Sequence, residues 1–359
     1  MLYKLGQLVK YSSNKINTNN LNPSTYISTE NMLPNIQGII KSSNVPENIN
    51  VCKFENSNIL LSNIRPYFHK LYFPSFTGGC SNDVLCFNII DSQLTLPKYL
   101  YYMMSTTSFI DYVVSTSKGT KMPRGDKNAI LDYTFNVVPF DQQLLIVDII
   151  GSIDDKIENN NKIIEKFNKF LKIKTNELLL YKTKKIQLND IIEECKEKTD
   201  IELTPYSVVN TGKVIIQNEQ FNKEIAKNIK GKYKKIKKDF FVYNPSRINI
   251  GSIGMMEDEI GCVSPIYIVF KCGVEYKIYL QQLLTFEFMI KEINKRCSGS
   301  VRQALPFKDL CSIEIYDIER DKLKLYNKYC ENIIKTIKKL EEENLKLQQL
   351  KNNYLAKFF

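Results

Sequence analysis

The sequence has little of what most enzyme active sites are built from. His69 is the only histidine among 359 residues, which disfavours histidine acid–base chemistry and a histidine-ligated metal site. Neither a phosphate-binding GxxxxGKS/T loop nor a dinucleotide fingerprint is present. The sequence therefore offers few candidates for a catalytic centre and none for a histidine-ligated metal site.

One short stretch is only superficially similar to a catalytic motif. Residues 244–247 read Asn-Pro-Ser-Arg, whereas the signature of adenine methyltransferases is Asn-Pro-Pro followed by an aromatic residue. The second proline and the aromatic residue are missing, and no glycine-rich cofactor loop precedes the stretch. We predict that these residues form a turn.

Signals for export or membrane insertion are also missing. Residues 1–10 lack the apolar core of a signal peptide, and no apolar run is long enough to cross a bilayer. The nine cysteines are an odd number without a CxxC pair, so we interpret them as reduced and mostly packed. We expect a soluble, cytoplasmic protein with no membrane partner.

What the chain does have is positive charge. Its net charge is +11, and 43% of its residues are hydrophobic, which is enough for the cores of two or three domains at this length. The charge favours a polyanionic partner such as nucleic acid. Compositional bias is the alternative, because many basic proteins bind no nucleic acid.

Two segments, 141–185 and 317–359, have coiled-coil spacing. Steps of alternately four and three residues give eleven seam positions in each segment. The first seam is Ile146, Ile150, Ile153, Ile157, Asn160, Ile164, Phe167, Leu171, Lys174, Leu178 and Tyr181. The second is Leu323, Tyr326, Cys330, Ile333, Ile337, Leu340, Asn344, Leu347, Lys351, Tyr354 and Phe358. Because each helix can bury only one stripe, we predict that the two pair antiparallel.

The polar interruptions of these seams match. Asn160 lies fourteen residues after Ile146, and Asn344 lies fourteen residues before Phe358. An antiparallel pair with aligned ends would place the two asparagines face to face, where a buried polar pair can fix the register. In the alternative interpretation, each asparagine only interrupts a surface helix.

The two halves of the chain repeat the same order of elements. Strand-like bursts, a helical stretch, a glycine loop and a long helix occur twice, about 180 residues apart. Matching pairs include Tyr26 with Tyr206 and Gly79-Cys80 with Gly261-Cys262. The predicted strands are 59–61, 83–90, 240–243 and 266–270, and the predicted helical stretches are 96–114 and 279–296.

These patterns predict an α+β fold with four parts. Two α/β domains, 1–140 and 186–316, alternate with helical spacers at 141–185 and 317–359. The spacers would form an antiparallel coiled coil with pseudo-two-fold symmetry. The first seam would span about 54 Å at roughly 1.5 Å per residue, so such a rod can hold two modules at a fixed spacing along a duplex.

Two glycine loops are candidate DNA contacts. The first offers Lys118, Thr120, Lys121, Arg124 and Lys127, and the second offers Ser298, Ser300, Arg302 and Gln303. Arginine and glutamine suit base edges, whereas lysine and hydroxyl groups suit phosphates. The alternative is an ordinary solvated turn, or a clamp against the adjoining helix.

Weaker candidates lie elsewhere. The run 223–238 carries eight lysines, among them Lys232 and Lys234, next to aromatic residues. This pattern fits either phosphate contacts or a solvated helical face. Arg65 and Arg247 also have aromatic neighbours and are predicted DNA contacts.

Several longer stretches resemble the specificity (S) subunits of type I restriction-modification systems. In the first half they are residues 119–135 (GTKMPRGDKNAILDYTF) and 138–164 (VPFDQQLLIVDIIGSIDDKIENNNKII). In the second half they are residues 204–226 (TPYSVVNTGKVIIQNEQFNKEIA), 240–254 (FFVYNPSRINIGSIG) and 261–270 (GCVSPIYIVF). The resemblance covers essentially the whole chain, as two target-recognition domains and two helical spacers.

This resemblance implies a non-catalytic chain that binds double-stranded DNA. Each recognition domain would read one half of a bipartite site, while the coiled coil would act as a ruler and as a docking site for two methyltransferase subunits. S-adenosylmethionine would bind to those partner subunits, and motor/nuclease subunits are further possible partners. Residues 317–359 lack the QQ…GSIDDKIE wording of the first spacer, so equivalent docking at both ends stays open.

Two other functions are compatible with the sequence. A self-contained DNA methyltransferase or nuclease with a degenerate motif would bind S-adenosylmethionine without a partner. A coiled-coil interaction protein with no DNA role would shift no duplex, even with a methyltransferase partner at low salt.

Overall fold

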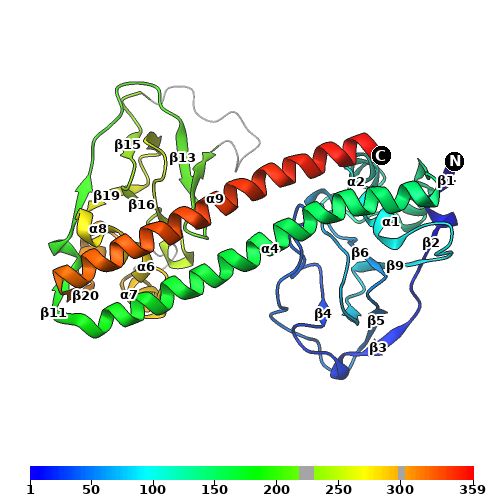
Figure 1. The fold of residues 1–359 in the computed structure, drawn as a ribbon, viewed down its shortest axis with the longest axis horizontal. Helices are drawn as coiled ribbons and strands as arrows, with labels where there is room; N and C mark the ends of the chain where they lie inside the picture. Colours follow the sequence, from blue (N-terminus) through cyan, green and yellow to red (C-terminus); the bar gives the residue numbers. More distant parts are fainter. Residues whose placement is uncertain (218–229, 298–303) are drawn as a thin grey trace. The chain divides into compact units, whose positions relative to one another are not determined.

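The computed structural model describes residues 1–217, 230–297 and 304–359 and confirms the α+β class (Figure 1). The chain divides into two compact units. Unit 1 comprises Met1–Asn161 and Glu341–Phe359, and unit 2 comprises Lys162–Leu340. Each unit therefore contains one part of each long helix, α4 (Phe140–Leu178) and α9 (Arg320–Phe358).

Unit 1 contains two four-stranded sheets and a two-stranded ribbon. The first sheet is antiparallel, in the order β2 (Val9–Tyr11), β9 (Val84–Ile89), β6 (Ile59–Ser62) and β7 (Leu71–Tyr72). The second has the order β3 (Lys15–Asn17), β5 (Asn50–Phe54), β8 (Gly78–Cys80) and β4 (Tyr26–Ile27), with β4 parallel to β8. The ribbon pairs β1 (Leu2–Lys4) with β10 (Thr134–Asn136).

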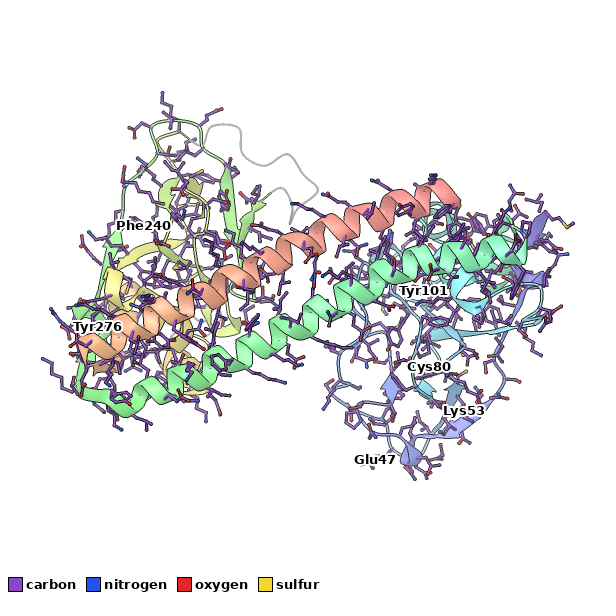
Figure 2. The ribbon with its side chains drawn as sticks, viewed as in Figure 1. Glu47, Lys53, Cys80, Tyr101, Phe240 and Tyr276 are labelled. Carbon is purple, nitrogen blue, oxygen red and sulfur yellow. The ribbon has the colours of Figure 1, made fainter. Side chains whose placement is uncertain are left out.

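Three short helices complete unit 1: α1 (Pro97–Met104), α2 (Thr107–Ser115) and α3 (Lys127–Asp132). Proline at the first position of α1 is favourable because that residue needs no hydrogen-bond donor. The side chains of Thr106 and Asp126 cap the next two helices. These helices bury Tyr99 and Phe109 in the unit's main core, and Figure 2 shows Tyr101 close by.

Unit 2 repeats this plan. One antiparallel sheet has the order β12 (Ile192–Cys195), β19 (Ile268–Cys272), β16 (Phe241–Tyr243) and β17 (Ile253–Met255). The other has the order β14 (Val214–Ile216), β13 (Pro205–Val208), β18 (Ile260–Val263) and β15 (Lys234–Lys237). A two-stranded ribbon pairs β11 (Lys182–Gln187) with β20 (Glu314–Ile318). The short α-helices are α6 (Lys277–Leu283), α7 (Glu287–Arg296) and α8 (Phe307–Cys311).

The internal repeat predicted from the sequence is confirmed element by element. Both long helices have 39 residues and begin 180 residues apart. In each unit one strand pair is parallel, β4 with β8 and β13 with β18, and these strands carry the matched Tyr26 and Tyr206. The sheets with a parallel pair differ in their edge strands. In unit 2, β14 is added next to β13, whereas in unit 1 β3 is added at the opposite edge, next to β5.

The long helices run antiparallel within each unit. In unit 1, Asp154 and Asn160 of α4 bond to Lys351 and Asn344 of α9, so one residue number rises as the other falls. In unit 2, the hydroxyls of Thr175 and Tyr326 lie 2.7 Å apart. The prediction that the two asparagines face each other is confirmed.

Two positions of the predicted first seam are wrong. Thr175 is fully buried, whereas Lys174 at the predicted position is only partly buried and forms an ion pair with Glu177. The short threonine can bury its hydroxyl because Tyr326 bonds to it, which a lysine amine cannot do without losing its hydration. Tyr181 is exposed because α4 ends at Leu178.

Residues from both ends of the chain pack into unit 1. Phe359 packs against the core that contains Leu5, and its ring centroid lies 5.0 Å from that of Tyr99. The two ends of the chain therefore contribute to the same core. All nine cysteines are free thiols, and six of them are buried. Among the described residues, none of the helices is both long and apolar enough to span a bilayer.

Candidate nucleic-acid interface

The first glycine loop is a closed, exposed structure in unit 1. The backbones of Lys118 and Arg124 exchange two hydrogen bonds, of 2.8 and 2.9 Å. Gly119 has a φ of +96°, which a residue with a side chain adopts only with strain. Thr120 and Lys121 are exposed between the two bonded residues, so the loop presents them to solvent.

The cations of this loop have carboxylate partners. The Lys118 amine lies 2.5 Å from a carboxylate oxygen of Asp126, and a terminal nitrogen of Arg124 lies 2.9 Å from Oδ1 of Asp83. The hydrogen bond from Lys118, together with backbone N–H donors, lowers the pKa of Asp126. Exposed ion pairs of this kind contribute little stability, so phosphate groups can compete for both cations.

Lys127 lies at the first position of α3, and its amine is 6.0 Å from the centre of the Tyr11 ring. This arrangement is a weak cation–π contact. The side chain is exposed, so the amine also remains accessible to a phosphate.

Arg65 lies beside this loop, which the sequence did not indicate. Its backbone N–H donates to the carbonyl oxygen of Pro123 at 2.7 Å, and Ile64 forms a β-bridge with Arg124. After the buried Pro66, the side chains of Tyr67 and Phe68 are 48% and 38% exposed. Tyr67 is the aromatic neighbour that makes Arg65 a candidate in the sequence, whereas Phe68 was missed, although it lies between Tyr67 and Lys70.

Unit 2 has the corresponding turn. Arg247 precedes the 3-10 helix Ile248–Ile250, just as Arg65 precedes the 3-10 helix Pro66–Phe68. The backbone N–H of Leu305 donates to the carbonyl oxygen of Pro245 at 3.1 Å, and that of Gly125 donates to Asn63 at 3.2 Å in unit 1. In each unit, the chain just before an arginine-headed turn is therefore bonded to a residue of the segment that leads to the next helix, Gly125 in unit 1 and Leu305 in unit 2.

Of the other stretches of unit 2 singled out in the sequence, the structure describes 244–247 but not 298–303. Ser298, Ser300, Arg302 and Gln303 lie outside the described residues. Residues 244–247 form the predicted turn, because Oδ1 of Asn244 accepts the backbone N–H of Ser246.

The described part of the lysine run includes strand β15, so the interpretation as a helical face is wrong there. Lys232 is exposed. The amine of Lys234 instead donates to the carbonyl oxygen of Tyr267 at 2.6 Å, and burial lowers its pKa. Lys232 is thus the more accessible of the two to a phosphate.

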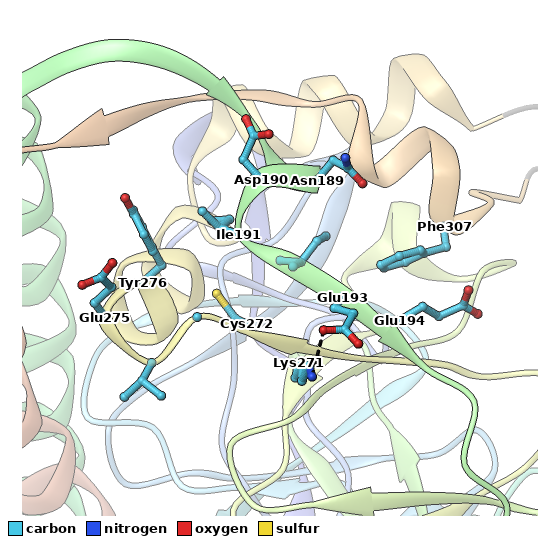
Figure 3. A pocket seen from close by; sticks show the side chains of 13 residues that line it. Asn189, Asp190, Ile191, Glu193, Glu194, Lys271, Cys272, Glu275, Tyr276 and Phe307 are labelled. Carbon is cyan, nitrogen blue, oxygen red and sulfur yellow. Dashed lines mark ion pairs between the residues drawn. The ribbon is translucent and has the colours of Figure 1, made fainter.

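A pocket of about 770 Å³ lies elsewhere in unit 2, between β12 and the end of β19 (Figure 3). Asp190, Glu193, Glu194 and Glu275 are among the described residues that line it, and Lys271 is paired with Glu193 at 2.8 Å. This excess of carboxylates repels a polyanion. The described residues contain no group of three or more side chains that could hold a metal ion.

Comparison with known proteins gives one family model and several solved structures that resemble this chain. The model of the type I restriction modification DNA specificity domain matches residues 1–169. A crystal structure of the S subunit of a type I restriction-modification system from M. genitalium covers 100% of this chain and 96% of its own, with 14% identity and a TM-score of 0.60. The HsdS subunit from Thermoanaerobacter tengcongensis covers 99% and 95%, with 13% identity and a TM-score of 0.38.

Comparison with curated proteins finds no match. The likeness to the M. genitalium subunit shows the fold, and the family model matches the first 169 residues. The chain therefore has the fold of an S subunit, and its residues 1–169 match the type I restriction modification DNA specificity domain.

Proposed function

We propose that this chain is the non-catalytic DNA-recognition subunit of a type I restriction-modification complex. The domains at 1–140 and 186–316 would each read one half of a bipartite site in double-stranded DNA. One observation carries the proposal: each unit has an arginine-headed turn at the corresponding position, and the chain before it is bonded to Gly125 in unit 1 and to Leu305 in unit 2, with different side chains in the two turns. Equivalent frames with unlike surfaces suit two unlike half-sites.

The helical segments at 141–185 and 317–359 would set the unread gap and dock the partners. Helices α4 and α9 each have 39 residues, or roughly 58 Å at about 1.5 Å per residue. They expose apolar side chains that a partner can cover, including Leu144 and Leu145 on α4 and Leu325 and Leu345 on α9. We propose that these surfaces take two methyltransferase subunits, which would supply S-adenosylmethionine, and that motor/nuclease subunits can join in the cytoplasm.

Selection from a random duplex pool tests this function. The full chain, with a methyltransferase subunit at low salt, should enrich two short motifs separated by a gap of fixed length. Enrichment of no sequence, or of one uninterrupted motif, would contradict the proposal. A catalytically inactive methyltransferase subunit without this chain is the control, and it should enrich nothing.

A further inference from the structure

Backbone strain in unit 1 gathers beside the candidate interface. Asn35, Ile36, Arg65 and His69 have φ between +50° and +58°, and they are four of the six non-glycine residues with positive φ among the described residues. This conformation is costly for residues with a side chain, above all for β-branched isoleucine, and it persists where the surrounding structure imposes it. In unit 2, 182 residues after His69, the left-handed position is occupied by Gly251.

The strained residues belong to two loops that are bonded to each other. The backbone N–H of Asn35 donates to the carbonyl oxygen of Phe68, and that of Ile36 donates to His69, both at 2.9 Å. Two bonds between successive residues fix the turn in one orientation. The turn is therefore pre-organised, so little conformational entropy remains to be lost when a ligand binds.

This turn presents a pair of aromatic rings. The centroids of Tyr67 and Phe68 lie 4.8 Å apart, and both side chains are exposed. The amine of Lys70 lies 5.7 Å from the centre of the Phe68 ring and donates to the carbonyl oxygen of Thr29 at 2.6 Å. Exposed aromatic rings on a rigid support are typical of binding surfaces.

The glycine loop bonded to this turn carries cations. The bond from the Arg65 backbone to Pro123 holds the turn against the glycine loop, which carries Lys118, Lys121 and Arg124. A ligand that suits both groups has flat apolar faces and negative charge, as a nucleic acid does. The turn of unit 2 has Asn249 and Ile250 at the positions of Tyr67 and Phe68, so it offers no rings.

We propose that Tyr67 and Phe68 form an aromatic edge that stacks on bases of the half-site read by unit 1. The inference rests on the proposed function. It adds a source of specificity in which unit 1 distorts or caps a base step, whereas the corresponding turn of unit 2 has no ring to stack on a base.

The test uses the full chain with a methyltransferase subunit and a labelled duplex selected from a random pool by the wild-type chain. The variant Tyr67→Ala/Phe68→Ala should bind this duplex about tenfold more weakly or worse. The salt dependence of binding should stay unchanged, because no phosphate contact is lost. The ring-keeping variant Tyr67→Phe/Phe68→Tyr is the matched control and should bind like the wild type.

A second measurement locates the contact. With 2-aminopurine placed in turn at each position of the duplex, the wild-type chain should change the fluorescence at one step of one half-site, and the alanine variant should not. Thermal unfolding of both variants should match the wild type, because the rings are exposed. Unchanged affinity and unchanged 2-aminopurine signals in the alanine variant would overturn the inference while leaving the proposed function intact. If the wild-type chain selects no duplex at all, the proposed function fails instead.

Discussion

The side-chain amide of Asn160 donates to Oδ1 of Asn344 at 2.9 Å, from one long helix to the other within unit 1. It also donates to Glu343 at 3.0 Å, while the amide of Asn344 donates to Asn161 at 2.9 Å. Asn160 is fully buried, and its own Oδ1 has no hydrogen-bond partner. A polar residue at a core seam position lowers stability but penalises other registers, because a shifted helix would leave the amide unbonded.

Replacing both residues by leucine should therefore stabilise the fold. We expect the variant Asn160→Leu/Asn344→Leu to unfold at higher urea concentration, with a gain of about 1 kcal/mol, because an unsatisfied buried group is removed. Asn160→Leu alone should gain less, because Asn344 loses a partner. Urea unfolding followed by circular dichroism measures both. A double variant that is less stable than the wild type would show that the amides contribute net stability.

A second polar contact between the long helices of unit 1 is expected to stabilise the fold, unlike the asparagine pair. The Lys351 amine lies 2.6 Å from Oδ1 of Asp154, whose other oxygen accepts the hydroxyl of Tyr102 at 2.9 Å. The lysine side chain is 9% exposed, and the aspartate is 28% exposed. Lys351→Met should cost roughly 2 kcal/mol of unfolding free energy, because it leaves a partly buried carboxylate without its cation.

The matched variant Asp154→Asn/Lys351→Met removes both charges and keeps an acceptor for Tyr102. We expect it to recover most of the lost stability, and a double-mutant cycle gives the interaction energy. If the double variant is as unstable as Lys351→Met, the loss comes from packing of the lysine stem rather than from the stranded charge.

Buried tyrosines predict a loss of stability at alkaline pH. Burial is the main cause that raises the pKa of Tyr102, Tyr243, Tyr279 and Tyr326 above the ordinary value of about 10. The folded state thus keeps these protons while the unfolded state releases them, so stability is fully present below about pH 10 and falls as the pH rises further. The urea concentration at which half of the protein is unfolded should therefore decrease as the pH is raised from 9 to 11. A flat midpoint, or full ionisation at 295 nm while the fold persists, would contradict the pKa shifts.

Much of the helical part was predictable, because the seam residues of a coiled coil recur at a regular spacing along the sequence. Stepping by four and three residues found positions that are buried or half-buried from Ile146 to Leu171 and from Leu323 to Lys351, and counting along them paired Asn160 with Asn344. The method failed at Lys174 and Tyr181. There a partner hydroxyl and the end of the helix decide which residue is buried, and neither is visible in a local pattern.

The interface was less predictable. The proximity of Arg65 to Pro123 depends on backbone bonds between loops about 60 residues apart in sequence, which no period encodes. Left-handed Ile36 adopts a conformation that β-branched residues avoid, so a sequence gives no reason to expect the loop that is bonded to the turn of Tyr67. Short strands of two to six residues likewise carry too few side chains to fix their order in the sheets.

Loss of single cations should separate base reading from phosphate binding. Arg124→Ala should relax sequence preference in one half-site, whereas Lys232→Ala should weaken binding to all sequences and reduce the salt slope by about one. Lys234→Ala should leave the salt slope nearly unchanged and lower stability, because its amine is bonded to Tyr267. Binding at several salt concentrations, with selected and scrambled duplexes, distinguishes these effects. Equal losses on both duplexes for Arg124→Ala would reject its assignment as a base reader.

Lengthening the two long helices tests the proposed ruler. Four residues inserted after Asn161 and four after Leu340 add about one turn, so the helix faces stay nearly aligned while each helix grows by about 6 Å. Because base pairs are stacked about 3.4 Å apart, the selected gap should grow by one or two base pairs with both half-sites unchanged. Replacing four existing residues by the same insert, without changing the length, is the control. A gap that stays constant in the lengthened chain would mean that some other contact fixes the spacing, and a changed half-site would mean that the insertion disturbs the recognition domains themselves.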